Sequence, residues 1–268
     1  MIERTPLVDD DGSGTVGTIF EDAWQEQLYD AMDEAYALTP QTTSSTGAQD
    51  NFDLDAHNVF LRCTGAAPVF SGFTVNGAAP SPGDRVVIQC LGTTAKVANQ
   101  DTGSTDVHRI ITPSIAGQIV GVNGRMELIY DGDTDRWREA LIEPGAPITR
   151  AFSAANYSGS SSMTWTVAAA TVDSYVQRGR SLQYLLHISG TVGGSVNTAL
   201  QITLPGGFTA AKPMYQPIIS NDGGVQQWGI AQSFASSATL QLFKAASTAG
   251  NWVAGVDFIL GALTIEIE

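Results

Sequence analysis

Three histidines and two cysteines are the side chains of this sequence best suited to metal binding or nucleophilic catalysis. His57, His108 and His187 lie on separate segments, and none has a second His or Cys at the spacing of zinc ligands. No base stands near Cys63 or Cys90 in the sequence, and the motifs of serine hydrolases, zinc peptidases, phosphate loops and dinucleotide-binding folds are absent. We therefore predict no catalytic residue, no metal ligand and no cofactor, and expect a protein that is not an enzyme.

Clustered aspartates offer carboxylates to calcium in two places. Residues 131–135 read Asp-Gly-Asp-Thr-Asp, but the bidentate glutamate that closes a calcium loop is missing. Asp-Gly between two strand-like segments is typical of a hairpin turn, which is the interpretation we adopt. Asp9, Asp10 and Asp11 are interpreted as part of a solvated acidic arm. A carboxylate pair assembled by the fold, as in glycosidases, stays open.

Aromatic side chains are the candidates for ligand contact near the C-terminus. Trp165 falls on the apolar side of an alternating segment and is expected in the core, as are most of the others. Trp228 and Trp252 follow Gly-rich turns, where binding side chains are often displayed. These two tryptophans are our candidate receptor contacts.

The two cysteines lie in apolar, strand-like stretches, Asn-Val-Phe-Leu-Arg-Cys and Val-Val-Ile-Gln-Cys. This environment favours packed thiols over a disulfide, although the sequence leaves open whether Cys63 and Cys90 pair.

Charge is distributed unevenly along the 268 residues. The formal net charge is -14, and residues 1–55 hold thirteen acidic residues against one arginine. From residue 148 onward, five acidic and five basic residues cancel. This balance argues against a nucleic-acid partner, which would need clustered Lys and Arg. No apolar stretch resembles a signal peptide or reaches the length of a membrane span, so we expect synthesis in a cytoplasm and no membrane insertion.

A single amphipathic helix is predicted within residues 19–40, and it ends before Pro40. An extended acidic arm precedes it. The apolar side chains of the helix recur at spacings of four and three residues and form one seam that must pack against a partner. The members of this anchoring seam are Trp24, Leu28, Ala31, Ala35 and Leu38.

The remainder of the sequence predicts a mainly β protein in two parts. A polar linker over residues 41–51 separates the helix from a central β-module, residues 51–146, whose short strands favour stacking with copies of the chain. A Pro- and Gly-containing boundary near residue 147 leads to a distal domain, residues 147–268. Its alternating segments predict a β-sandwich or jelly roll.

Several of these segments resemble virion fibre proteins of tailed bacteriophages, especially tail fibres built of successive trimeric β-modules. Residues 11–35 look like their particle-attachment segment. The strand after Gly83-Asp84, the turn Ser-Thr-Asp-Val-His-Arg at 104–109 and the hairpin Tyr-Asp-Gly-Asp-Thr-Asp-Arg-Trp at 130–137 are similar to a common module of these fibres. Residues 152–194 and 200–214 resemble a terminal domain of the same class.

The resemblance implies an intertwined homotrimer in the virion, anchored through residues 1–50 to other virion proteins, with β-modules projecting outward. Its distal domain would contact a host glycan or protein. Three functions follow as hypotheses. The first is a tail fibre for host attachment; the second is a head fibre or capsid decoration protein, with a collar fibre as a variant. The third is a short tailspike that degrades surface polysaccharide.

Overall fold

The computed structural model describes residues 37–244 and 250–268, and it is mainly β. The arm and four members of the anchoring seam, Trp24, Leu28, Ala31 and Ala35, lie outside the described residues. Leu38 is described, and the predicted helix end is wrong there. Leu38 is not helical, and Pro40 lies within the first strand, β1 (Thr39–Thr43). Proline is compatible with this position because β1 is the edge strand of its sheet.

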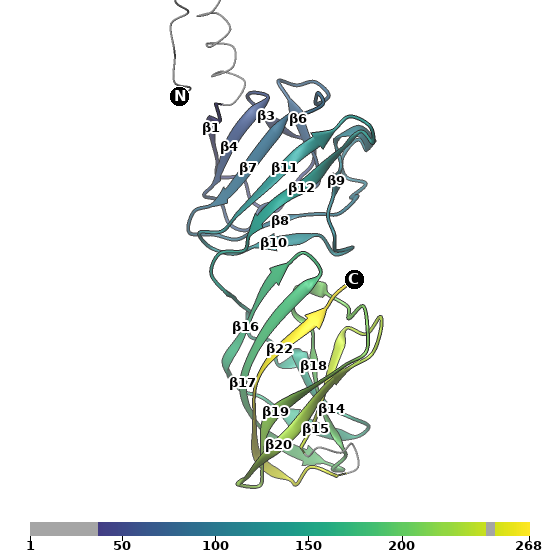
Figure 1. Ribbon diagram of the computed structural model, residues 1–268. Coiled ribbons are helices and arrows are strands. Elements are labelled where there is room, and N and C mark those ends of the chain that lie inside the picture. The colour runs from purple at the N-terminus through teal and green to yellow at the C-terminus, as the bar shows by residue number, and fades with distance from the viewer. Residues whose placement is uncertain (1–36, 245–249) are drawn as a thin grey trace, which may run out of the picture.

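Residues 39–143 form a solenoid in which successive turns of the chain stack strand on strand (Figure 1). Parallel pairing joins the turns along three lines. The first line is β1, β4 (Asn58–Cys63) and β7 (Arg85–Cys90); the second is β2 (Ala48–Gln49), β5 (Val69–Phe70) and β8 (Ala95–Val97); the third is β3 (Phe52–Leu54) and β6 (Phe73–Val75).

Stacked side chains from successive turns fill the interior of the solenoid. Thr43 is in register with Cys63, and Cys63 with Cys90, and all three side chains are buried. Both cysteines are free thiols, which confirms the prediction of packed thiols. The stacking was not predicted from the sequence. The segment expected to be a polar linker, residues 41–51, instead contains most of β1 and all of β2, and Thr43 at the end of β1 is buried in this interior.

Four further strands close the solenoid. They are β9 (Ile110–Ile111), β10 (Gln118–Val120), β11 (Arg125–Asp131) and β12 (Arg136–Glu143), with a 3-10 turn η1 (Asp106–His108) before β9. β10 and β11 pair antiparallel with β8 and β7, β12 pairs antiparallel with β11, and β9 pairs parallel with β12. The resulting sheets have the orders β1-β4-β7-β11-β12-β9 and β10-β8-β5-β2. Trp137 of β12 is fully buried against Phe73 and Tyr130 with edge-to-face rings, and its indole N–H donates to the Phe73 carbonyl. The β11–β12 hairpin therefore contributes Tyr130 and Trp137 to the aromatic part of the solenoid core.

Residues 148–266 form one ten-stranded sheet that curls around a second core. The order is β13-β16-β17-β22-β19-β20-β21-β18-β14, with β15 paired to β17. The strands are β13 (Ile148–Thr149), β14 (Tyr157–Gly159), β15 (Met163–Thr166), β16 (Ala170–Arg178), β17 (Ser181–Gly194), β18 (Ala199–Thr203), β19 (Met214–Asp222), β20 (Val225–Ser233), β21 (Thr239–Phe243) and β22 (Gly255–Glu266), with 3-10 turns η2 (Ala154–Asn156) and η3 (Pro205–Gly207). We call this part the C-terminal domain.

Period-two alternation determines which side chains enter this core. Trp165 is buried, as expected. On β15, β17, β18 and β22 the side chains that enter the core are two residues apart: Met163, Trp165, Leu182, Tyr184, Leu186, Ile188, Leu200, Ile202, Leu263 and Ile265. One charged cluster is buried with them. Asp173 accepts hydrogen bonds from the hydroxyls of Tyr157 and Tyr184, and Arg150 lies 3.6 Å from its carboxylate.

Two buried glutamines join the solenoid to the C-terminal domain. Gln177 of β16 donates from Nε2 to the Gly117 carbonyl (2.8 Å) and accepts from the Ile119 amide (2.9 Å). Gln118 of β10 accepts from the Gly179 amide (3.0 Å). Figure 1 shows β10 next to the upper ends of β16 and β17, and β10 contacts β16 there. The glutamine pair makes the two parts one elongated unit, since buried amides without these partners would be costly.

Candidate binding surface

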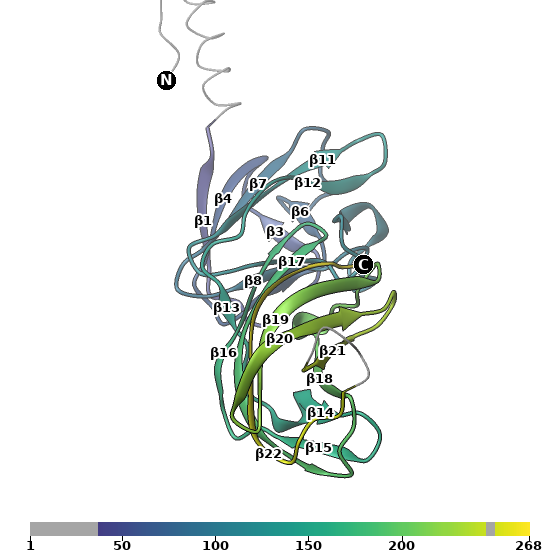
Figure 2. The same cartoon turned by 60° about the horizontal axis from the view of Figure 1, so that its bottom comes forward.

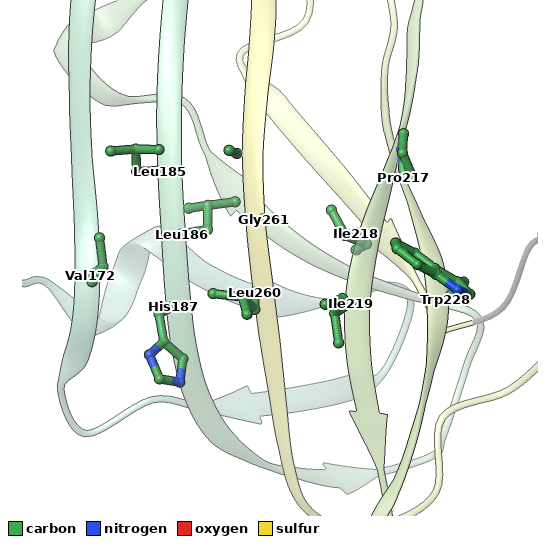
Figure 3. Close-up of a pocket in the computed structure, with 11 residues that line it drawn as sticks. Val172, Leu185, Leu186, His187, Pro217, Ile218, Ile219, Trp228, Leu260 and Gly261 are labelled. Carbon is green, nitrogen blue, oxygen red and sulfur yellow. The ribbon is translucent and has the colours of Figure 1, made fainter.

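A row of five side chains crosses the outer face of the C-terminal domain. The register places Val172 opposite His187, and His187 opposite Leu260. Leu260 is in turn opposite Ile219, and Ile219 opposite Trp228. Figure 3 shows the five side chains crossing β16, β17, β22, β19 and β20 in line. We call them the Trp228 row.

The Trp228 row faces outward because the neighbouring residue on each strand faces inward. Leu186, Ile218 and Ile259 are buried in the core, so the next side chain on β17, β19 and β22 must point to the opposite face. Exposure is 37% for Val172, 40% for Leu260 and 68% for Trp228. The row is therefore a continuous apolar strip and not a set of scattered surface residues.

An open groove of about 480 Å³ runs along the row. Leu185, Pro217 and Ala262 complete its lining beside the row. In Figure 3, Gly261 lies between Leu186 and Ile218. A Cβ added at Gly261 would lie only 2.9 Å from Ile218 Cγ2, so glycine allows the close packing beneath the groove.

The chemistry of the groove is that of apolar contact. Among the described residues that line it, His187 is the one titratable side chain, and its ring packs edge-to-face with Phe258 at 6.1 Å between centroids. The described lining contains no Asp, Glu, Lys or Arg. A lining of this kind suits contact with a flat apolar surface.

The two candidate receptor tryptophans have opposite environments. Trp228 is exposed, as expected. Trp252 is 1% exposed, so its assignment to the surface is wrong. Its backbone amide donates to the Asn197 carbonyl, and its ring belongs to the core of the C-terminal domain. A Gly-rich flank identifies a turn but does not reveal whether the next side chain points inward.

The histidines and the aspartate cluster are dispersed and locally bonded. His57 Nδ1 lies 2.7 Å from Asp84 Oδ1, and His108 Nδ1 lies 2.8 Å from Asn51 Oδ1. Asp131 bonds within its own hairpin, accepting from the Asp133 amide and neighbouring side chains, which confirms the turn interpretation for residues 131–135. Asp9, Asp10 and Asp11 lie outside the described residues. Within residues 37–244 and 250–268, no group of three or more His, Cys, Asp or Glu is placed to hold a metal ion.

One pair of neighbouring carboxylates lies at the β19–β20 hairpin. Asp222 pairs with Lys244 at 2.6 Å and accepts from the Val253 amide. Asp257 accepts from the Gly223 amide through Oδ1, while its buried Oδ2 has no partner among the described residues. Burial raises the pKa of Asp257, and the Asp222 charge adds to that effect. Both carboxylates are buried, so neither is accessible to a glycosidic bond.

No family model matches the chain, and no curated protein matches it. Among the described residues, no helix has the length and apolarity needed to cross a bilayer.

Proposed function

We propose that this protein is a structural fibre of a tailed bacteriophage particle, with no catalytic activity, anchored by its N-terminal segment and presenting its C-terminal domain to the host surface. The observation that carries the proposal is the glutamine joint. The buried side chains of Gln118 and Gln177 each hydrogen-bond to the backbone of the other part and so fasten a solenoid to a second β-domain. This arrangement suits a part that projects from a particle.

The distribution of charge supports the same orientation. The acidic residues concentrate in residues 1–55, whereas the basic and acidic residues from 148 onward cancel. In this proposal the N-terminal segment, with the anchoring seam of Trp24, Leu28, Ala31, Ala35 and Leu38, contacts other virion proteins. Copies of the chain assemble as an intertwined homotrimer, and the C-terminal domain contacts a host glycan or protein.

A label on the C-terminal domain, at the end of that domain farthest from the solenoid, tests this orientation. The Gly223-Gly224 turn is suitable because it joins β19 and β20 at the end farthest from the solenoid, whereas Glu268 is bonded to Ser114 at the joint (Figure 1). An epitope inserted there should be found by electron microscopy projecting from the tail. Label on the capsid would instead favour the head fibre or decoration protein, and particles without label would overturn the proposal.

Removal of residues 1–36 tests the anchor. The truncation leaves all the described strands intact, since β1 begins at Thr39. We expect a folded protein that no longer joins particles; normal incorporation of the truncated chain would contradict the anchoring role.

A further inference from the structure

We propose that the Trp228 row is a contact surface between copies of this chain. In a single chain the row is exposed to water across five strands. Covering this strip with another apolar face is favourable, because it removes apolar surface from water. The inference deepens the proposed function by naming the face through which a fibre of several copies would assemble.

The electrostatics of the C-terminal domain favour a like partner. Its acidic and basic residues are equal in number from residue 148 onward, so two copies of this part have no net charge to repel each other. None of the described residues that line the groove is an Asp, Glu, Lys or Arg, so the lining presents no charge that a different partner would have to neutralise. An uncharged, apolar face of a neighbouring copy satisfies both conditions.

A second apolar row lies on the solenoid. The register aligns Pro40 with Phe60 and Phe60 with Val87, and the line continues through Glu127 to Leu141. These residues lie on the outer face of the sheet β1-β4-β7-β11-β12, beside a groove of about 200 Å³ that Arg85 and Arg125 also line. The row is therefore apolar in part, and its Val87 is only 5% exposed. Arg85 neutralises the one acidic member, Glu127, at 2.7 Å.

The two rows lie on the same side of the molecule. In Figures 1 and 2 together, β11 and β12 lie in front of β3 and β6, and β19 and β20 lie in front of β14 and β15. A neighbouring copy lying alongside can therefore cover both rows, whereas a small ligand in the C-terminal groove would cover one. The shared side favours a second copy over a host glycan, which also needs more hydrogen-bonding side chains than the groove has.

Substitution of Leu260 by lysine tests the contact. Leu260→Lys places a charge at the centre of the row, and Thr164→Lys adds the same charge to an exposed position of β15, on the opposite side of the domain. Native mass spectrometry of the full chain should show assembled wild type and Thr164→Lys, and at least a tenfold weaker assembly for Leu260→Lys. Unchanged melting curves by circular dichroism would establish that both variants fold.

Cross-linking tests the same face independently of what else holds the copies together. The native thiols are buried, so a bifunctional maleimide will react with an introduced surface cysteine. Leu260→Cys should give cross-linked dimers and Thr164→Cys should not. A wild-type monomer at micromolar concentration, or equal cross-linking of the two variants, would overturn the inference.

Host attachment is measured separately, so that the two proposals can fail separately. If Leu260→Lys stays fully assembled and cross-linking at position 260 is absent, while attachment is lost, the row binds the host and the inference is wrong although the fibre function stands. If assembly depends on Leu260 but the protein is absent from particles, the inference stands and the fibre function fails.

Discussion

Gln118 and Gln177 exchange hydrogen bonds across the joint between the solenoid and the C-terminal domain. Gln118 Nε2 donates to the Gln177 carbonyl at 3.4 Å, and the Gln177 side chain bonds to the backbone on both sides of Gln118. Both side chains are buried. Because each amide satisfies backbone groups of the other part, neither part can move away without exposing or orphaning several polar groups.

Replacing Gln177 by alanine should weaken the joint. The change leaves the Gly117 carbonyl and the Ile119 amide without their buried partner, and we expect a loss of about 2 to 4 kcal/mol in the free energy of unfolding. Urea denaturation measures it. Gln183→Ala, at an exposed position of β17, should cost under about 0.5 kcal/mol. Equal effects of the two changes would show that the joint contributes no more than surface glutamine does.

Trp252 and Trp228 should differ strongly on truncation. Trp252→Ala removes a fully buried indole and should cost about 3 to 5 kcal/mol, because it leaves a cavity in the core. Trp228→Ala should cost less than about 1 kcal/mol in the isolated chain. Thermal denaturation of the two variants at concentrations where the chain is monomeric provides the comparison, and a larger loss for Trp228 would contradict the buried position of Trp252.

The stacked thiols should make stability fall at alkaline pH. Burial raises the pKa of Cys63 to about 12 and that of Cys90 to about 11, from an ordinary value of 9.0. Between pH 9 and the raised pKa of each thiol, the unfolded chain releases thiol protons that the folded chain retains. The free energy of unfolding therefore decreases as pH rises from 9 toward 12. The double variant Cys63→Ala with Cys90→Ala should show a shallower decrease in denaturant titrations. An identical slope would exclude the thiols as its source.

The buried carboxyl of Asp257 should make the free energy of unfolding decrease as pH rises from acidic toward neutral values. Burial raises the pKa of its carboxyl, so its contribution to stability is fully present below the unfolded pKa and is lost as pH rises through the folded pKa. Asp257→Asn removes the buried charge, and the difference in unfolding free energy between variant and wild type should shift in favour of the variant from pH 4 to pH 7. A difference independent of pH would show that Asp257 is not protonated preferentially in the folded chain. Asp133→Asn, at an exposed turn position, serves as the control.

Local alternation was sufficient to predict much of the C-terminal core. Leu182, Tyr184, Leu186 and Ile188 are two residues apart, and a strand sends such residues to one face whatever surrounds it. The hairpin at residues 131–135 was predictable for a similar reason, since Asp-Gly favours the turn locally. By contrast, Trp252 carries no alternating signal, and its burial depends on strands far away in the sequence.

The sequence by itself determined the β class, the inward face of each alternating strand and the unequal distribution of charge, because each depends on neighbouring residues or on simple counts. Tertiary structure alone decided that Thr43, Cys63 and Cys90 stack in a solenoid, that Gln118 meets Gln177, and that Val172, His187, Leu260, Ile219 and Trp228 form one row. These relationships join residues from separate strands. The pairing of strands that are distant in the sequence brings them together, and no local pattern states which distant strands pair.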